Sequence, residues 1–184
     1  GKFPSKDDPF SLQRVECATL ELARRAGIDA ARARIQEVGP HDVLMIERFD
    51  REYSPKGYFR QAMVSAMTLV GADESISSRP RWSYPLLADQ LRRWSTKPDA
   101  DRVELFRRMI FNAAVTNDDD HPRNHALLRA AKGWQLSPAY DVLPARRLSL
   151  EHRDLALTVG DHGRTASIFN LVSQCARFGL SPEE

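Results

Sequence analysis

The stretch TNDDDHPRNH, residues 116–125, concentrates three consecutive acids, two histidines and two asparagines directly after an apolar helical run. Asn and Asp favour turns through local backbone hydrogen bonds, so a solvated loop is the simplest interpretation. His121 and His125 could instead hold a metal ion for hydrolysis. Pro122 between them disfavours a zinc-binding helix, and the neighbouring acids are better suited to a hard cation such as Mg²⁺.

A third interpretation of this stretch rests on spacing. Asp119 is followed five residues later by Asn124, which is the D-x-x-x-x-N pattern of a protein-kinase catalytic loop. Phosphoryl transfer needs a carboxylate that orients and deprotonates the acceptor hydroxyl, and it needs oxygen ligands for Mg²⁺. Asp141 follows a predicted β-hairpin over 125–137, and a hairpin returns the chain to where it left. Asp119, Asn124 and Asp141 are therefore expected to converge.

Two features near the start of the chain agree with this interpretation. Lys2 lies in the strand-like GKFP, and Glu16 falls on the otherwise apolar stripe of a helix predicted over 11–26. An acid on an apolar face needs a partner, and kinases pair a strand lysine, which contacts the phosphates, with a helix glutamate. The apolar strand ending at IERF, 46–49, could link two lobes and offer backbone groups to adenine. The helical stripe consists of Leu12, Glu16, Leu20 and Ala23.

The rest of the pattern predicts a strand-rich beginning and a helical remainder. Strands are expected over 31–38 and 43–49, with turns over 39–42 and 54–57. Helices are expected over 60–70, 84–95 and 101–115, the last opened by a capping box of Asp101 and Glu104. A strand at 155–159 and a helix near 165–178 close the sequence. This order predicts an α+β fold with two unequal parts.

Composition limits the classes of function. The 184 residues are 42% hydrophobic and 28% charged, which is ordinary for a globular protein. A net charge of +2 gives no reason to expect direct binding of nucleic acid or an anionic membrane. Cys17 and Cys175 lie far apart, which favours reduced thiols. No apolar run approaches the roughly 18 residues that a membrane span needs, so a cytoplasmic protein is expected.

Three segments resemble a known family. ERFDR (47–51), NDDDHPRN (117–124) and LSPAYDVLP (136–144), in this order, are similar to the HipA-type serine/threonine kinases of bacterial toxin–antitoxin modules. KFPS and VECATLELARRAGI (15–28) resemble the strand and helix that carry the lysine and glutamate of that family. The likeness covers nearly the whole chain. It implies a protein-kinase-like core, with a remnant of the N-lobe over 1–50 and a helical C-lobe over 51–184.

Carried over residue by residue, the resemblance assigns a role to each matching position. Asp119 would be the catalytic base, and Asn124 and Asp141 would be the metal ligands. Lys2, with its partner Glu16, would contact the phosphates of ATP. The remaining residues of the nucleotide site would be the hinge residues Glu47, Arg48 and Phe49, together with His121, Pro122, Arg123, Asn124, Tyr140 and Asp141.

The resemblance also implies cofactors and partners. It implies a kinase that uses ATP and Mg²⁺ to phosphorylate a cytosolic protein, an aminoacyl-tRNA synthetase in known members, and thereby arrests growth. A small DNA-binding antitoxin is the expected partner. The sequence contains no G-x-G-x-x-G and opens at the lysine strand, so the Gly-rich loop is expected to be missing. Two alternatives stay open: a catalytically silent module that binds an antitoxin, and a small-molecule kinase.

Overall fold

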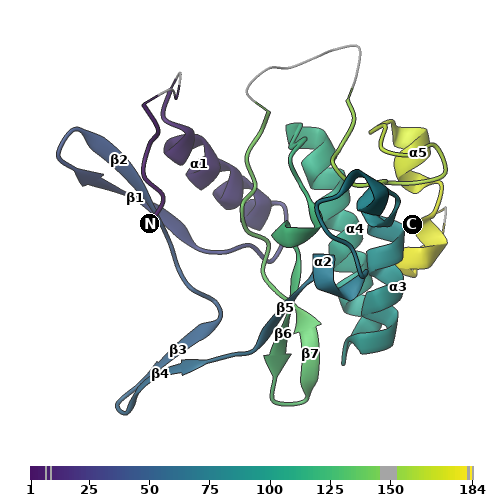
Figure 1. Cartoon of the computed structure of the whole chain (residues 1–184), viewed down its shortest axis with the longest axis horizontal. Coiled ribbons are helices and arrows are strands. Elements are labelled where there is room, and N and C mark those ends of the chain that lie inside the picture. Colours follow the sequence, from purple (N-terminus) through teal and green to yellow (C-terminus); the bar gives the residue numbers. More distant parts are fainter. Residues whose placement is uncertain (7, 9, 146–152, 182, 184) are drawn as a thin grey trace.

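The computed structural model describes residues 1–6, 8, 10–145, 153–181 and 183. Its first part combines helix α1 (Leu12–Arg25) with an antiparallel hairpin of β1 (Ala33–Val38) and β2 (His41–Ile46). The backbone of Lys2 pairs with that of Leu44 in both directions, at 2.8 and 3.0 Å. This bridge fixes the start of the chain beside β2 (Figure 1).

Local sequence explains where α1 begins and ends. The side chain of Ser11 accepts a backbone hydrogen bond from the first turn, and Gly27, with φ of +80°, follows the last turn. The predicted stripe is confirmed, because all four of its members are buried: Leu12, Glu16, Leu20 and Ala23. Glu16 is thus a carboxylate on the buried face of the helix, as its position in the sequence indicated.

The prediction of a helix over 60–70 was wrong. Strands β3 (Arg51–Ser54) and β4 (Gly57–Arg60) form a projecting hairpin, followed by β5 (Met63–Ser65) and the short helix α2 (Ala66–Leu69). β5 pairs with a strand that lies far along the sequence, and such pairing overrides local helical preference. The helix begins only after Ser65, whose side chain caps it.

The predicted hairpin over 125–137 is confirmed. It consists of β6 (Ala126–Ala130) and β7 (Gly133–Leu136), and with β5 it makes a three-stranded sheet in the order β5-β6-β7. Figure 1 shows this sheet between α1 with its hairpin on one side and the remaining helices on the other. The polar loop, residues 116–125, therefore leads directly into the central strand of the sheet.

Two long helices, α3 (Tyr84–Trp94) and α4 (Pro98–Val115), lie where helices were predicted. The predicted capping box was wrong, because α4 begins at Pro98 and Asp101 lies inside it. The buried carboxylate of Asp101 instead accepts from Ser95 Oγ at 2.7 Å and from Leu136 N at 2.8 Å. The short helices are η1 (Ile76–Arg81), η2 (Pro122–Asn124), α5 (Ile168–Val172) and η3 (Cys175–Phe178).

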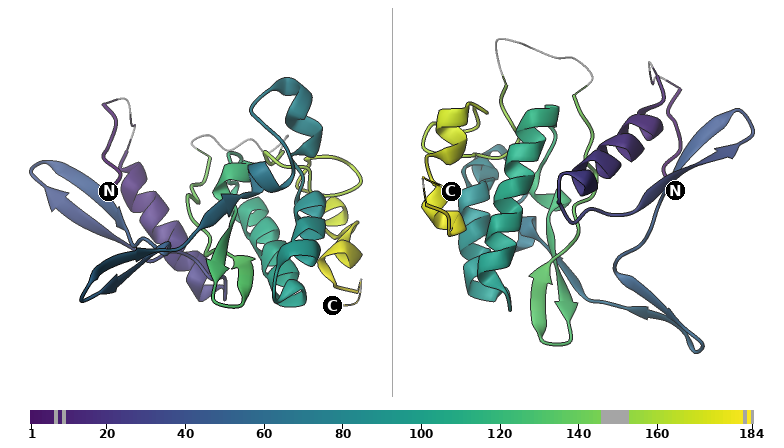
Figure 2. Two further views of the ribbon diagram at one scale, coloured as in Figure 1. Left: turned by 60° about the horizontal axis from the view of Figure 1, so that its bottom comes forward. Right: turned by 180° about the vertical axis from the view of Figure 1, so that it is seen from behind.

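Two predictions for the last part of the chain need correction. Residues 155–159 form no regular strand, and Thr158 makes a single parallel bridge with Ser83. The helix expected near 165–178 is divided into α5 and η3, which pack beside α3 and α4 (Figure 2). No helix in the described part of the chain is long and apolar enough to cross a membrane.

Two apolar clusters hold these elements together. The larger one joins α3, α4, the three-stranded sheet and residues 155–159, and it includes the fully buried Tyr84 and Phe178. The smaller one joins α1 to the chain that follows β7. Its members are Leu20, Ala23, Ile28, Ala30, Ala139 and Val142. The smaller cluster therefore fixes Asp141, which lies between two of its members, against the first part of the molecule.

Candidate active site

Lys2, Glu16 and Asp141 form one ionic group. Lys2 Nζ lies 2.8 Å from Glu16 Oε1 and is also paired with Asp141. Burial lowers the pKa of Lys2, but the hydrogen bonds to Asp141 and Glu16 outweigh it, and the pKa is raised overall. Burial raises the pKa of Glu16 more than the ammonium of Lys2 lowers it. The group thus joins the N-terminal segment, α1 and the segment after β7.

The polar loop is held by backbone hydrogen bonds. His121 N donates to Asp119 O and Asn124 N donates to His121 O, both at 2.8 Å. The side-chain amide of Asn124 then donates to Asp119 O at 3.3 Å and to Asp141 O at 3.4 Å. The structure therefore brings Asp119, Asn124 and Asp141 together, as their spacing predicts. The carboxylate of Asp119 is exposed.

The backbone is strained on both sides of this group. Besides glycines, only Thr116 and Asp141 have a positive φ among the described residues, at 60° and 58°. Residues other than glycine rarely adopt this left-handed region of the backbone, and such backbone strain clusters at functional sites. Thr116 caps the C-terminal end of α4 and is the first residue of the polar loop, and its carbonyl accepts from Ala145 N at 2.8 Å. The two strained residues thus lie in the two segments that the side-chain amide of Asn124 joins.

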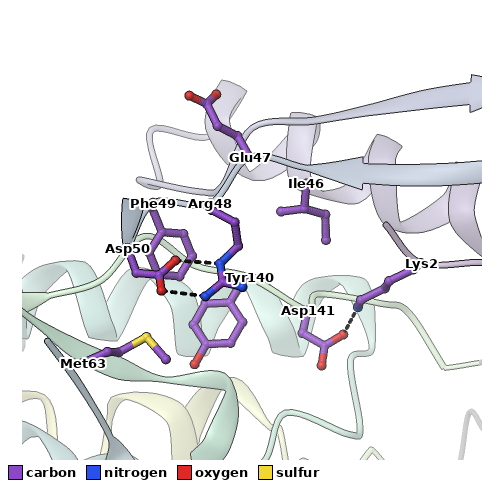
Figure 3. A pocket seen from close by; sticks show the side chains of 9 residues that line it. All are labelled: Lys2, Ile46, Glu47, Arg48, Phe49, Asp50, Met63, Tyr140 and Asp141. Atoms are coloured by element: carbon purple, nitrogen blue, oxygen red, sulfur yellow. Dashed lines mark hydrogen bonds and ion pairs between the residues drawn. The ribbon is translucent and has the colours of Figure 1, made fainter. Parts of the chain in front are cut away.

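A pocket of about 280 Å³, here called the Lys2 pocket, opens beside the ionic group (Figure 3). Phe49 and Tyr140 form one end, with ring centroids 5.4 Å apart, and Met63 lies beside them. Lys2 and Asp141 form the opposite end. One end of the pocket thus carries the aromatic rings beside the Arg48–Asp50 ion pair, and the other carries the Lys2–Asp141 ion pair. Its lining consists of Lys2, Ile46, Glu47, Arg48, Phe49, Asp50, Met63, Tyr140 and Asp141.

The three predicted hinge residues lie in this pocket but differ in orientation. The ring of Phe49 faces the pocket, whereas the carboxylate of Glu47 points away from the other labelled side chains (Figure 3). The guanidinium of Arg48 donates twice to Asp50, at 2.6 Å each. This bond lowers the pKa of Asp50. Arg48 is thus already paired, and Phe49 supplies the apolar surface.

The predicted residues His121, Pro122 and Arg123 do not line the Lys2 pocket. Pro122 is buried at the start of η2. His121 and Arg123, with Asp119, line a second pocket of about 300 Å³, here called the Asp119 pocket. The hydroxyl of Tyr140 donates to the carbonyl of Arg123 at 2.6 Å. Tyr140, which lines the Lys2 pocket, therefore connects that pocket to the chain over 121–124.

The family model of the HipA-like C-terminal domain matches residues 1–184, which is the whole chain. The chain belongs to this family. The HipA-like domain is similar to Y4mE of Sinorhizobium fredii, with 28% identity over 131 residues, or 70% of this chain and 31% of that protein. It is also similar to the serine/threonine-protein kinase toxin HipA of Shewanella oneidensis, with 23% identity over 170 residues, or 84% of this chain and 39% of the toxin.

Two solved structures share the fold of the HipA-like domain. Shewanella oneidensis HipA, in its complex with HipB and operator DNA, superposes with a TM-score of 0.80 at 22% identity, covering 97% of this chain and 45% of that one. The Helicobacter pylori proinflammatory kinase CtkA superposes with a TM-score of 0.59 at 16% identity, covering 77% of this chain and 48% of CtkA. The HipA-like domain thus spans less than half the length of each of these relatives, and its mixed α+β fold is that of the shared part.

A buried polar network lies beneath the polar loop of the HipA-like domain. Asp120, only 2% exposed, accepts from the hydroxyl of Tyr84 and lies 2.9 Å from His125 Nε2. Asn112 Nδ2 donates to the same hydroxyl at 3.0 Å, and Asn112 Oδ1 accepts from Asn117 Nδ2 at 3.1 Å. Burial and the charge of Asp120 raise the pKa of Tyr84 well above its ordinary value. This network anchors the loop to α3 and α4.

The network also separates the two histidines of the loop. The ring of His125 packs on Tyr84, whereas the ring of His121 faces Trp82. No group of three or more His, Cys, Asp or Glu residues in the described part of the chain is placed to hold a metal ion. The arrangement therefore does not support a metal site shared by His121 and His125. The sequence offered no signal for the network, because Asp120 sits in a run of three identical acids.

Proposed function

We propose that this HipA-like domain is the core of a serine/threonine protein kinase that uses ATP. The observation that carries the proposal is the Lys2–Glu16–Asp141 group, which lies at one end of an aromatic-lined pocket and beside the Asp119–Asn124 loop. Kinases place a paired lysine, a metal-binding aspartate and a loop with a base and an asparagine in this relation. The family membership and the likeness to HipA support the same reading.

The two ends of the Lys2 pocket suit the two ends of a nucleotide. Phe49, Tyr140 and Met63 offer the flat apolar surface on which adenine stacks. Lys2 supplies the cation for the phosphates, and Glu16 holds that cation in place from the buried face of α1. ATP would bind in this orientation, with its γ-phosphate toward the polar loop.

Asn124 and Asp141 are the residues that would hold Mg²⁺. Asn124 uses its amide nitrogen on two backbone carbonyls, and its oxygen receives no hydrogen bond from the described residues. Mg²⁺ sites in kinases need only one or two protein oxygens, because phosphates and water complete the octahedron. The residues therefore fit the ion, which when bound neutralises charge on the phosphates.

Asp119 would act on the acceptor. Its exposed carboxylate accepts the proton of a serine or threonine hydroxyl as the hydroxyl oxygen attacks the γ-phosphorus. The bond from the γ-phosphorus to the β–γ bridging oxygen breaks, and ADP leaves with that oxygen. Asn124 holds the backbone of Asp119 through its carbonyl, so the base is oriented by the residue five positions later.

A small DNA-binding antitoxin is the proposed partner. The support is the likeness of fold to Shewanella oneidensis HipA, which was solved with HipB and operator DNA. A net charge of +2 favours contact with DNA through such a partner over direct contact. A tagged copy of the chain should co-purify with a small basic protein from the cells that encode it. Purification without such a protein, at native expression, would contradict this part of the proposal.

Transfer of the γ-phosphate tests the kinase proposal. The chain would be incubated with γ-labelled ATP, Mg²⁺ and a bacterial cytosolic extract, with nucleotide binding measured on the same sample. Label on a protein band that requires Mg²⁺ supports the proposal and identifies the acceptor, with an aminoacyl-tRNA synthetase and growth arrest as the first expectation. Binding of ATP with no labelled protein contradicts it. Label on an aminoglycoside or sugar alone would identify a small-molecule kinase.

A further inference from the structure

Two buried residues of the polar loop each follow a residue that is assigned to phosphoryl transfer. Asp120 follows Asp119, which is the proposed base. His125 follows Asn124, which is a proposed metal ligand. The side chains of Asp120 and His125 are each only 3% exposed, and His125 Nε2 lies 2.9 Å from Asp120 Oδ2. The Asp120–His125 pair therefore closes the segment that carries the base and the metal ligand.

Each member of the pair is also held by a neighbouring helix. Asp120 Oδ2 accepts from the hydroxyl of Tyr84, the first residue of α3. His125 O accepts from Ala66 N at 2.8 Å, at the start of α2. An ionised carboxylate only accepts hydrogen bonds, so His125 donates to it through Nε2. His125 Nδ1 has no hydrogen-bond partner among the described residues, and the imidazole thus acts through Nε2 alone.

A cavity of about 10 Å³ lies beside the pair. Its lining includes Asp120, Asn124, His125 and Tyr140. This is about the space that one water molecule needs. Side chains around so small a cavity are closely packed, and close packing transmits a displacement from one side chain to the next. A shift of the pair would therefore reach Asn124 by contact and Asp119 through the backbone.

We propose that Asp120 and His125 are positioning residues, whose hydrogen bond sets the separation between the base and the metal ligand. This inference rests on the proposed kinase function for the roles of Asp119 and Asn124. Neither member of the pair lines the Lys2 pocket, so neither contacts the nucleotide there. The imidazole of His125 acts on the reaction from beneath the polar loop, as a hydrogen-bond donor to Asp120.

Two substitutions at one position separate the hydrogen bond from the packing of the side chain. His125→Gln keeps an N–H donor near the place of Nε2, whereas His125→Leu keeps a similar size and removes the donor. Transfer of the γ-phosphate should fall about 10²-fold in His125→Leu, which is the loss expected for a misplacement of about 1 Å. His125→Gln should recover most of the rate. His41→Leu, at an exposed position on β2, should transfer phosphate as the wild type does.

The dependence of transfer on Mg²⁺ tests whether Asn124 has moved. The Mg²⁺ concentration for half-maximal transfer should rise in His125→Leu and return towards the wild-type value in His125→Gln. The Kd for ATP without Mg²⁺ should stay unchanged in both variants. A purely structural role would lower the amount of active protein and leave the half-maximal Mg²⁺ concentration as it is. That result, or equal transfer rates in the two variants, would overturn the inference.

Hydrogen exchange examines the polar loop without requiring transfer. The backbone amides of His121 and Asn124 donate to Asp119 O and His121 O. These amides should exchange about tenfold faster in His125→Leu than in His125→Gln, because a hydrogen bond to a charged group is lost. Equal exchange would overturn the inference at any rate of transfer. Faster exchange in His125→Leu, with no transfer by the wild type, would support the pair as the link that holds the loop and count against the kinase proposal.

Discussion

Lys2 Nζ lies 2.8 Å from Glu16 Oε1, so the N-terminal segment is tied to the buried face of α1 by a charged pair. Glu16 is only 4% exposed, and a buried carboxylate without a cation is costly. Lys2→Met should therefore lower the free energy of unfolding by about 1–3 kcal/mol at neutral pH. Urea denaturation measures the change. Lys132→Met, at an exposed turn, should change it by less than about 0.5 kcal/mol.

The pH dependence of that change follows from the two pKa shifts. The raised pKa of Lys2 means that its contribution to stability is complete below pH 10.5 and is lost as pH rises through the raised value. The pKa of Glu16 is raised, so the fold favours the protonated carboxyl. The contribution of Glu16 to the free energy of unfolding is therefore complete below pH 4.5 and declines as pH rises above it. The cost of Lys2→Met should hence shrink in acid, where Glu16 is protonated. A constant cost from neutral pH to below 4.5 would contradict this account.

The buried network should matter for stability. Tyr84→Phe removes the hydroxyl that donates to Asp120 and accepts from Asn112. Both partners stay buried, so the free energy of unfolding should fall by about 1–3 kcal/mol. Tyr58→Phe is the matched control, since that ring is exposed and its hydroxyl has no hydrogen bond to any described residue. Equal stabilities for the two variants would show that the network contributes nothing.

Tyr140, which lines the Lys2 pocket and donates to the carbonyl of Arg123, provides a spectroscopic reporter of the candidate site. Burial, with the charges of Asp141 and Asp120, raises its pKa from 10 to about 12. The neutral phenol is favoured in the fold, so its contribution to stability is lost as pH rises from 10 to 12. Tyrosinate absorbance of the folded chain should lose a late step near pH 12 in Tyr140→Phe. If Tyr140→Phe instead lost an absorbance step near pH 10, the phenol of Tyr140 would be exposed to solvent, which would contradict this account.

Nucleotide binding should depend on the aromatic end of the Lys2 pocket. Phe49→Ala removes one ring of the Phe49–Tyr140 pair. Loss of a stacked ring costs about 1–3 kcal/mol, which is roughly a 10- to 100-fold increase in the Kd for ATP. Isothermal titration calorimetry measures the change. Phe59→Ala, on the exposed hairpin of β3 and β4, should bind ATP as the wild type does.

Periodicity and spacing predicted much of this fold. The stripe of α1 and the two hairpins are local patterns, and each hairpin carries its own turn. The helix expected over 60–70 failed for a reason outside that segment. Met63–Ser65 pairs with β6, a strand that lies far along the chain, and no pattern within the segment reports that pairing. The predicted capping box at Asp101 failed for a similar reason, because the carboxylate of Asp101 accepts hydrogen bonds from Leu136 N and Ser95 Oγ.

In the candidate site, too, the local pattern was predicted and the long-range packing was not. Spacing predicted that Asp119, Asn124 and Asp141 meet, because a hairpin brings its two ends together. The family resemblance assigned His121 and Arg123 to the nucleotide site, and the structure places both in the Asp119 pocket. The three acids at 118–120 are identical in sequence, and only packing buries Asp120 while Asp119 stays exposed.

The role of Asp119 is tested most directly by the rate of γ-phosphate transfer in Asp119→Asn. The substitution keeps the size of the side chain and removes its capacity to accept a proton. Transfer to protein should fall by about 10²–10⁴-fold, with ATP affinity unchanged. Glu52→Gln, an exposed acid on β3, should transfer phosphate at the wild-type rate. Wild-type transfer by Asp119→Asn would contradict the assignment of Asp119 as the base and, with it, the kinase mechanism proposed for this chain.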